Sequence, residues 1–133
     1  MKDHVKLVFV YILEAHAVDE WPINSGRYNH GRGPVSVMQP TTNQERINLA
    51  TRFQNDFDCK QIPMLVDSIG NEFEKKYAPW PLRFYGIRDD EISYVANPKE
   101  CSFDPFQLRS WCLDQISCIP TKETIGTEFA TNK

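Results

Sequence analysis

The sequence lacks a long apolar run, and it also lacks a block of basic residues. Its longest apolar segment, 7–13, is far shorter than the roughly 20 residues that a helix needs to cross a bilayer. We therefore expect a soluble chain as written. The formal net charge is -3, and nucleic acids bind clustered basic side chains that neutralise phosphates. No nucleic acid is expected as a partner.

Closely spaced metal ligands are also missing. No two cysteines form a Cys-x-x-C pair, and the three histidines share no metal-ligand spacing with them. We predict no metal site. Cys112 falls on the apolar face of a predicted helix, where a free cysteine usually packs as a small apolar residue. The four cysteines are Cys59, Cys101, Cys112 and Cys118.

The apolar pattern predicts one domain over residues 1–118, followed by a polar tail over 119–133. A nearly continuous β-branched and aromatic run indicates a first strand buried on both faces. Further apolar runs and helical repeats extend the pattern to seven elements. The predicted strands are 5–13, 62–66, 82–87 and 91–96, and the predicted helices are 42–57, 71–79 and 104–117.

Polar residues at three positions mark helix starts. Thr42 followed by Glu45 is a capping-box pattern, and Asn71 followed by Glu74 repeats the spacing. Asp104 precedes a proline, which favours the first position of a helix. The order strand, helix, strand, helix, hairpin, helix predicts an α/β fold with a mixed sheet covered on both sides. Segment 21–40 has no such pattern; with His30, it is either a substrate lid or a solvated insertion.

Glu14 and His16 follow the first predicted strand. On an extended backbone, positions i and i+2 project to the same side, so these side chains are expected to share one face. A carboxylate next to an imidazole favours the charged imidazolium and fixes its orientation. The pair is therefore a candidate for proton transfer, although a strand-end histidine is more often a structural hydrogen-bonding residue.

The longer string Tyr11-Ile12-x-Glu14-Ala15-His16-x-x-Asp19-x-Trp21 resembles the signature of the iodothyronine deiodinase family. Other short strings follow the family in order and at similar spacing over about residues 5–117. They are Gln39-Pro40, Glu45-Arg46, Ile62-Pro63-Met64-Leu65-Val66-Asp67, Ala78-Pro79-Trp80-Pro81, Arg83-Phe84-Tyr85 and Ser93-Tyr94.

The resemblance implies a thioredoxin-like oxidoreductase that removes iodide from an aromatic ring. It implies no bound cofactor and a thiol reductant as cosubstrate. Glu14 and His16 match the family's proton relay, and Trp21 and Lys99 are the expected substrate contacts. Pro81 matches the position where thioredoxin-like proteins often place a cis-proline. Vertebrate members are membrane-anchored homodimers, so a homodimer is possible here.

This sequence departs from the vertebrate pattern at several positions. Pro40 occupies the place of a functional histidine, and Leu82 that of a ligand-binding glutamate. A vertebrate cysteine that helps to resolve the oxidised intermediate aligns with Ile62. Cys59 lies three residues earlier, either as its substitute or as an ordinary loop cysteine. Trp80 either lines the pocket or fills the core.

The family's selenocysteine or cysteine nucleophile has no match in this sequence. The first βα unit of the fold, which carries that residue, is expected to be missing because the first predicted strand begins near Met1. We therefore expect the chain alone to be inactive, and to be unstable, domain-swapped or repacked. Two alternatives remain open from the sequence, a ligand-binding pseudoenzyme and a general thiol redoxin or peroxidase.

Overall fold

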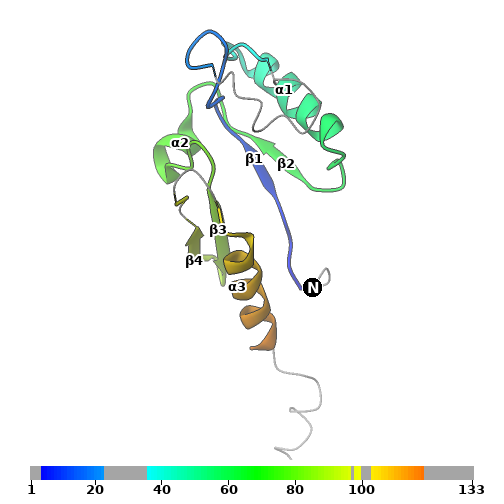
Figure 1. The fold of residues 1–133 in the computed structure, drawn as a ribbon, viewed down its shortest axis with the longest axis vertical. Helices are drawn as coiled ribbons and strands as arrows, with labels where there is room; N and C mark the ends of the chain where they lie inside the picture. Colours follow the sequence, from blue (N-terminus) through cyan, green and yellow to red (C-terminus); the bar gives the residue numbers. More distant parts are fainter. Residues whose placement is uncertain (1–3, 23–35, 97, 100–102, 119–133) are drawn as a thin grey trace, which may run out of the picture. The chain divides into compact units, whose positions relative to one another are not determined.

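The computed structural model describes residues 4–22, 36–96, 98–99 and 103–118. The predicted tail 119–133 and the loop residue His30 lie outside these residues. The elements are β1 (Phe9–Tyr11), α1 (Asn43–Asp56), β2 (Met64–Val66), α2 (Glu72–Tyr77), β3 (Phe84–Arg88), β4 (Glu91–Ala96) and α3 (Pro105–Ser117) (Figure 1). The chain forms two compact units, one of residues 7–83 and one that combines residues 1–6 with 84–133.

In the 7–83 unit, β1 and β2 form a parallel ladder with α1 against it (Figure 1). The ring of Phe53 on α1 meets Phe9 and Tyr11 edge-on, at centroid distances of 6.3 and 6.1 Å. Both strands are shorter than predicted, and the expected strand 5–13 is wrong at its two ends. Only three residues of β1 lie opposite β2. The flanking residues are apolar, but apolar character alone does not give them a hydrogen-bonding strand partner.

The helix α1 begins as its sequence predicts. The Thr42 hydroxyl accepts a hydrogen bond from the Glu45 backbone N–H, and the Glu45 carboxylate accepts from the Thr42 N–H. The backbone N–H of Thr41 also donates to this carboxylate and is the main cause of a lowered pKa at Glu45. A lowered pKa means that the cap is intact above the usual carboxyl range and weakens as the pH falls.

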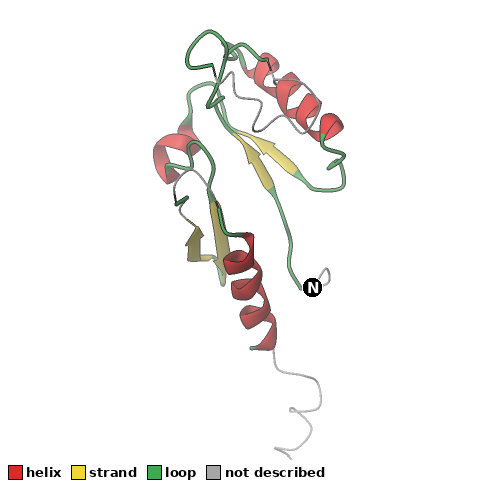
Figure 2. Ribbon diagram, viewed as in Figure 1, coloured by secondary structure: helices red, strands yellow, loops and turns green. Residues whose placement is uncertain are grey.

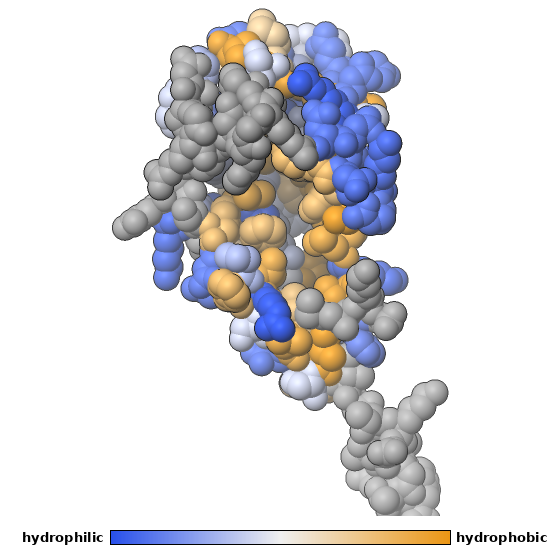
Figure 3. Space-filling view, turned by 45° about the vertical axis from the view of Figure 1, so that its right-hand side comes forward, coloured by the Kyte–Doolittle hydropathy of each residue, from blue (hydrophilic) through white to orange (hydrophobic). Residues whose placement is uncertain are grey.

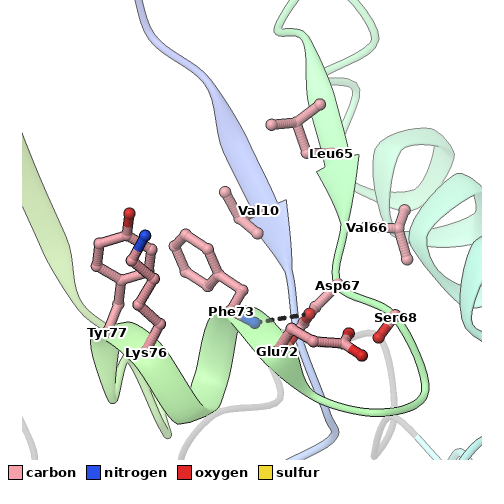
Figure 4. A pocket seen from close by; sticks show the side chains of 9 residues that line it. All are labelled: Val10, Leu65, Val66, Asp67, Ser68, Glu72, Phe73, Lys76 and Tyr77. Carbon is pink, nitrogen blue, oxygen red and sulfur yellow. Dashed lines mark hydrogen bonds between the residues drawn. The ribbon is translucent and has the colours of Figure 1, made fainter. Parts of the chain in front are cut away.

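The helix α2 starts where predicted, but the predicted capping side chain is wrong. Asn71 has φ 56 and makes no capping hydrogen bond with its side chain. The Asp67 carboxylate caps the helix instead, because it accepts from the backbone N–H of Phe73 at 3.0 Å and of Glu74 at 3.1 Å (Figure 4). A residue at the end of β2 thus supplies the anionic cap that a helix N-terminus favours.

The Asn71 side chain is used by a buried arginine. Arg46 on α1 is only 2% exposed, and its Nη1 donates to Asn71 Oδ1 at 2.8 Å. The same nitrogen donates to the carbonyl oxygens of Ser68 at 2.6 Å and Asp67 at 3.3 Å. Arg46 therefore ties α1 to the turn between β2 and α2.

In the other unit, β3 and β4 form the predicted antiparallel hairpin, and α3 packs on it (Figure 2). Asp89 and Asp90 both have positive φ, as a two-residue type I′ turn requires. Asp104 caps α3 by accepting from the Phe106 N–H at 2.9 Å. A Cβ on Gly86 would approach the Trp111 ring to 2.4 Å, so the missing side chain allows the helix to approach closely.

The observed strands give an α/β fold, as predicted, with one parallel and one antiparallel ladder. Within the described residues these are two separate two-stranded sheets rather than one mixed sheet. The buried apolar side chains described are few, namely Ala17, Ala50 and Cys59, while many large apolar side chains reach the surface (Figure 3). No helix in the described ranges is both long and apolar enough to span a membrane.

Candidate functional site

The candidate site begins where β1 ends. Past Tyr11 the backbone bends at Leu13, and this bend lets two side chains three positions apart meet. The Tyr11 hydroxyl donates a hydrogen bond to Glu14 Oε1. Burial raises the pKa of Tyr11 well above its usual value, and the bond to Glu14 and its negative charge raise the pKa further. Tyr11 therefore stays protonated and holds the Glu14 carboxylate in place.

This contact predicts a difference in alkaline stability. Because the folded pKa of Tyr11 is raised, its stabilising contribution is complete below pH of about 10, where unfolded tyrosine is also neutral. It is lost as the pH rises further, because the unfolded state ionises first. We expect the wild-type unfolding free energy to fall more steeply above pH of about 10 than that of Tyr11→Phe.

The extra slope should remain below the limit of about 1.4 kcal/mol per pH unit, since the tyrosine is partly exposed and screened by solvent. Urea titrations at a series of pH values measure the two slopes. Parallel pH dependences for the two proteins would contradict the raised pKa.

His16 lies against Trp21, whose ring in turn lies near that of Trp80. Its Nδ1 is 3.2 Å from the carbonyl oxygen of Trp21, and the two ring centroids are 5.2 Å apart. Since a carbonyl oxygen only accepts, Nδ1 carries the proton when this bond forms, and Nε2 is left for a ligand. The ring of Trp80 lies 6.5 Å from that of Trp21, with an interplanar angle of 25°.

Both indoles face solvent, Trp21 with 61% and Trp80 with 37% of its surface exposed. Of the two alternatives for Trp80, the core position is therefore wrong. The Trp80–Pro81 peptide bond is cis, which confirms the expectation for that proline. The site thus presents an imidazole nitrogen next to an exposed aromatic surface.

The expected contact between Glu14 and His16 is not formed. The prediction assumed that the backbone stays extended through both residues, whereas β1 ends at Tyr11 and bends follow. In the described part of the chain, the Glu14 carboxylate binds Tyr11, and no hydrogen bond or ion pair joins it to His16. The two residues remain close in sequence on one bent segment, and their catalytic roles stay predictions.

Gln39 is the residue of this site that the sequence analysis did not single out. Its side chain makes two hydrogen bonds with the Glu14 backbone and one with the Glu20 carboxylate. Its backbone N–H donates to Asp19 Oδ1 at 2.9 Å. Gln39 belongs to one of the strings that carried the family resemblance, so its position was visible in the sequence but its partners were not.

The remaining predicted residues belong to other segments of the chain. Lys99 is an exposed residue of the other unit, and its role as a substrate contact stays a prediction. Cys59 is 8% exposed, which favours an ordinary packed cysteine over a reactive one. Cys112 is half-buried and free. Within the described ranges, no three potential metal ligands lie close enough together to hold an ion.

A concave region lies next to α2. It is a hollow of about 360 Å³ lined mainly by apolar and aromatic side chains (Figure 4). Its Asp67 carboxylate already caps α2, and its Ser68 hydroxyl accepts from the Gly70 N–H. Neither Glu14 nor His16 lines it. The other ionisable side chains of its lining, Glu72 and Lys76, are not among the site residues predicted from the sequence. The lining residues are Val10, Leu65, Val66, Asp67, Ser68, Glu72, Phe73, Lys76 and Tyr77.

Comparison with known proteins identifies the family. The model of the iodothyronine deiodinases matches residues 1–116. The chain belongs to the iodothyronine deiodinase family. The type I iodothyronine deiodinase of Xenopus laevis is 25% identical over 103 residues, which are 77% of this chain and 37% of that protein. The chain thus corresponds to little more than a third of that deiodinase.

Membership confirms the resemblance found in the sequence, and with it the thioredoxin-like α/β fold. In general terms, deiodinases act on iodinated aromatic substrates with thiol reductants. All the residues of the His16 cluster lie inside the matched range. The match to the deiodinase family therefore includes every residue of the candidate site.

Proposed function

We propose that this chain carries the acid–base and ligand-binding part of a thiol-dependent reductive deiodinase. The observation that carries the proposal is that one segment holds two contacting pairs, Tyr11 with Glu14 and His16 with Trp21, in a chain of the deiodinase family. These pairs offer a held carboxylate, an imidazole with one nitrogen directed to a carbonyl, and an exposed aromatic surface. These are groups that can move a proton and bind an aromatic ring.

The reaction divides into two steps. A selenolate or thiolate attacks the iodine, so that the carbon–iodine bond breaks and a sulfur–iodine or selenium–iodine bond forms. The ring carbon keeps the electron pair and takes a proton, which His16 delivers from Nε2. Two thiols of the reductant then restore the nucleophile, forming a disulfide and releasing iodide and two protons, one of which returns to His16. We propose that this nucleophile is supplied from outside these 133 residues.

The substrate ring contacts Trp21 and Trp80 in this proposal. Their indole faces lie at 25° to each other next to His16, and stacked aromatic pairs contribute about 0.5 to 1.5 kcal/mol beyond buried area. Lys99 would pair with a carboxylate of the substrate. A homodimer belongs to the same proposal.

The test measures iodide released from 2,6-diiodophenol in the presence of dithiothreitol. We expect release by the natural protein that contains this chain together with its nucleophile. The 133-residue chain should instead bind the phenol without turnover, observed as tryptophan fluorescence quenching that is stronger than potassium iodide produces. Cys59→Ala in the natural protein serves as a control and should leave the rate unchanged.

Two outcomes would contradict the proposal. Binding of the phenol by the natural protein without thiol-dependent iodide release would indicate a pseudoenzyme. Peroxide-dependent oxidation of the thiol without iodide release would indicate a general thiol peroxidase.

A further inference from the structure

The segment that carries His16 has little regular structure of its own. Residues 12–22 follow β1 and contain only bends and turns. Their backbone positions therefore depend on hydrogen bonds from elsewhere in the chain. The partner segment is 36–40, which precedes α1, and one backbone bond joins the two where the Val18 N–H donates to the Val37 carbonyl at 2.9 Å.

Gln39 makes most of the remaining bonds between these segments. Its Oε1 accepts from the Glu14 backbone N–H at 3.0 Å, and its Nε2 donates to the Glu14 carbonyl at 3.1 Å. This pair of bonds resembles the exchange between opposite residues of an antiparallel ladder. The side chain of Gln39 thus replaces a strand partner for Glu14, just beyond the end of β1.

The side-chain amide of Gln39 also contacts Glu20, near the other end of the segment that carries His16. Nε2 donates to Glu20 Oε2 at 3.0 Å, and the backbone N–H of Gln39 donates to Asp19 Oδ1. Residues 14 and 20 flank His16 on its two sides. The Gln39 amide uses both of its N–H donors and accepts one hydrogen bond at its oxygen. These partners define which atom of the amide is Oε1 and which is Nε2.

The arrangement requires a glutamine. A glutamate would lose both donors and would place a negative charge against the Glu14 carbonyl and the Glu20 carboxylate. An asparagine is one methylene shorter, and an alanine makes none of the side-chain bonds. We propose that Gln39 is a positioning residue, which holds the Glu14–Glu20 segment so that the Glu14 carboxylate and the His16 imidazole point at the substrate.

The structural role of Gln39 is independent of the proposed function, whereas its expected effect on catalysis rests on that function. A displacement of about 1 Å at a reacting group can cost about 100-fold in rate. In the natural protein we expect Gln39→Ala to lower kcat by about 10- to 100-fold, with KM changed less than twofold, because the aromatic surface of Trp21 and Trp80 is retained. A change in KM alone, or no change in either constant, would overturn it.

Gln44→Ala is the matched control. Gln44 is an exposed glutamine five positions further on, and its Nε2 donates to Asn48 Oδ1 at 3.0 Å on the surface of α1. Its removal should leave kcat and KM unchanged. Equal losses of kcat in the two variants would show a general effect on folding and would overturn the positioning role.

A second measurement does not depend on turnover. In the 133-residue chain, hydrogen exchange followed by NMR should show the Glu14 amide exchanging at least about 10-fold faster in Gln39→Ala than in wild type or Gln44→Ala. The unfolding midpoint of each protein shows whether the change is local. An unchanged Glu14 exchange rate would overturn the positioning role, whereas absence of iodide release from the wild-type protein would count against the proposed function alone.

Discussion

Arg46→Met is expected to destabilise the chain by about 1 to 3 kcal/mol, because it leaves buried hydrogen-bond acceptors without a donor. Methionine fills a similar volume but has no donors. The substitution leaves the Asn71 amide oxygen and the Ser68 and Asp67 carbonyls without their buried partner. Each hydrogen bond from a charged group contributes about 1.5 to 3 kcal/mol, and bonds that share one nitrogen are not additive.

Arg52→Met on the same helix is the matched control. Arg52 is exposed and its Nε lies 3.3 Å from Asp56 Oδ2, four positions later. Such exposed pairs contribute about 0.5 kcal/mol or less. Urea unfolding of the wild type and the two variants gives both changes in free energy. Similar small values for the two variants would show that the buried network around Arg46 contributes little.

The destabilisation by Arg46→Met should also weaken α2, the next helix along the chain. Arg46 holds the 67–71 turn, and Asp67 in that turn caps α2. In Arg46→Met, the amides of Phe73 and Glu74 should therefore exchange faster than those of β1. Uniform acceleration of exchange would indicate global destabilisation without a specific link to α2.

Local signals predicted much of the fold. The caps at Thr42 and Asp104 act within one helical turn of their partners, so the sequence contains all the information they need. The hairpin follows for the same reason, because three residues separate the two predicted strands. These elements are confirmed close to their predicted bounds.

Features that depend on distant partners were predicted less well. Asp67 caps α2 from six positions before Phe73 because Arg46 takes the Asn71 side chain, and no sequence pattern contains that competition. The extended backbone expected at Glu14 and His16 is not observed, because the pairing of β1 with β2 ends at Tyr11. Gln39 meets Glu14 across 25 positions, so only the fold reveals why this residue belongs to the site.

His16→Gln is expected to lower kcat/KM for deiodination by about 100- to 10,000-fold, the usual contribution of a general acid. Glutamine keeps a donor for the Trp21 carbonyl but cannot deliver a proton near neutral pH. Binding of 2,6-diiodophenol, followed by tryptophan fluorescence, should change by less than about threefold, because the two indoles remain in place.

His4→Gln is the matched control, since His4 is an exposed histidine outside the cluster. It should leave kcat/KM unchanged.

Glu14→Gln removes the carboxylate that Tyr11 holds, and it should lower kcat without the loss of binding that a disordered site would show. If the two residues act in one proton transfer, the double variant should be little worse than His16→Gln alone. Additive losses would mean that Glu14 and His16 act in separate steps, which would agree with the lack of a direct contact between them.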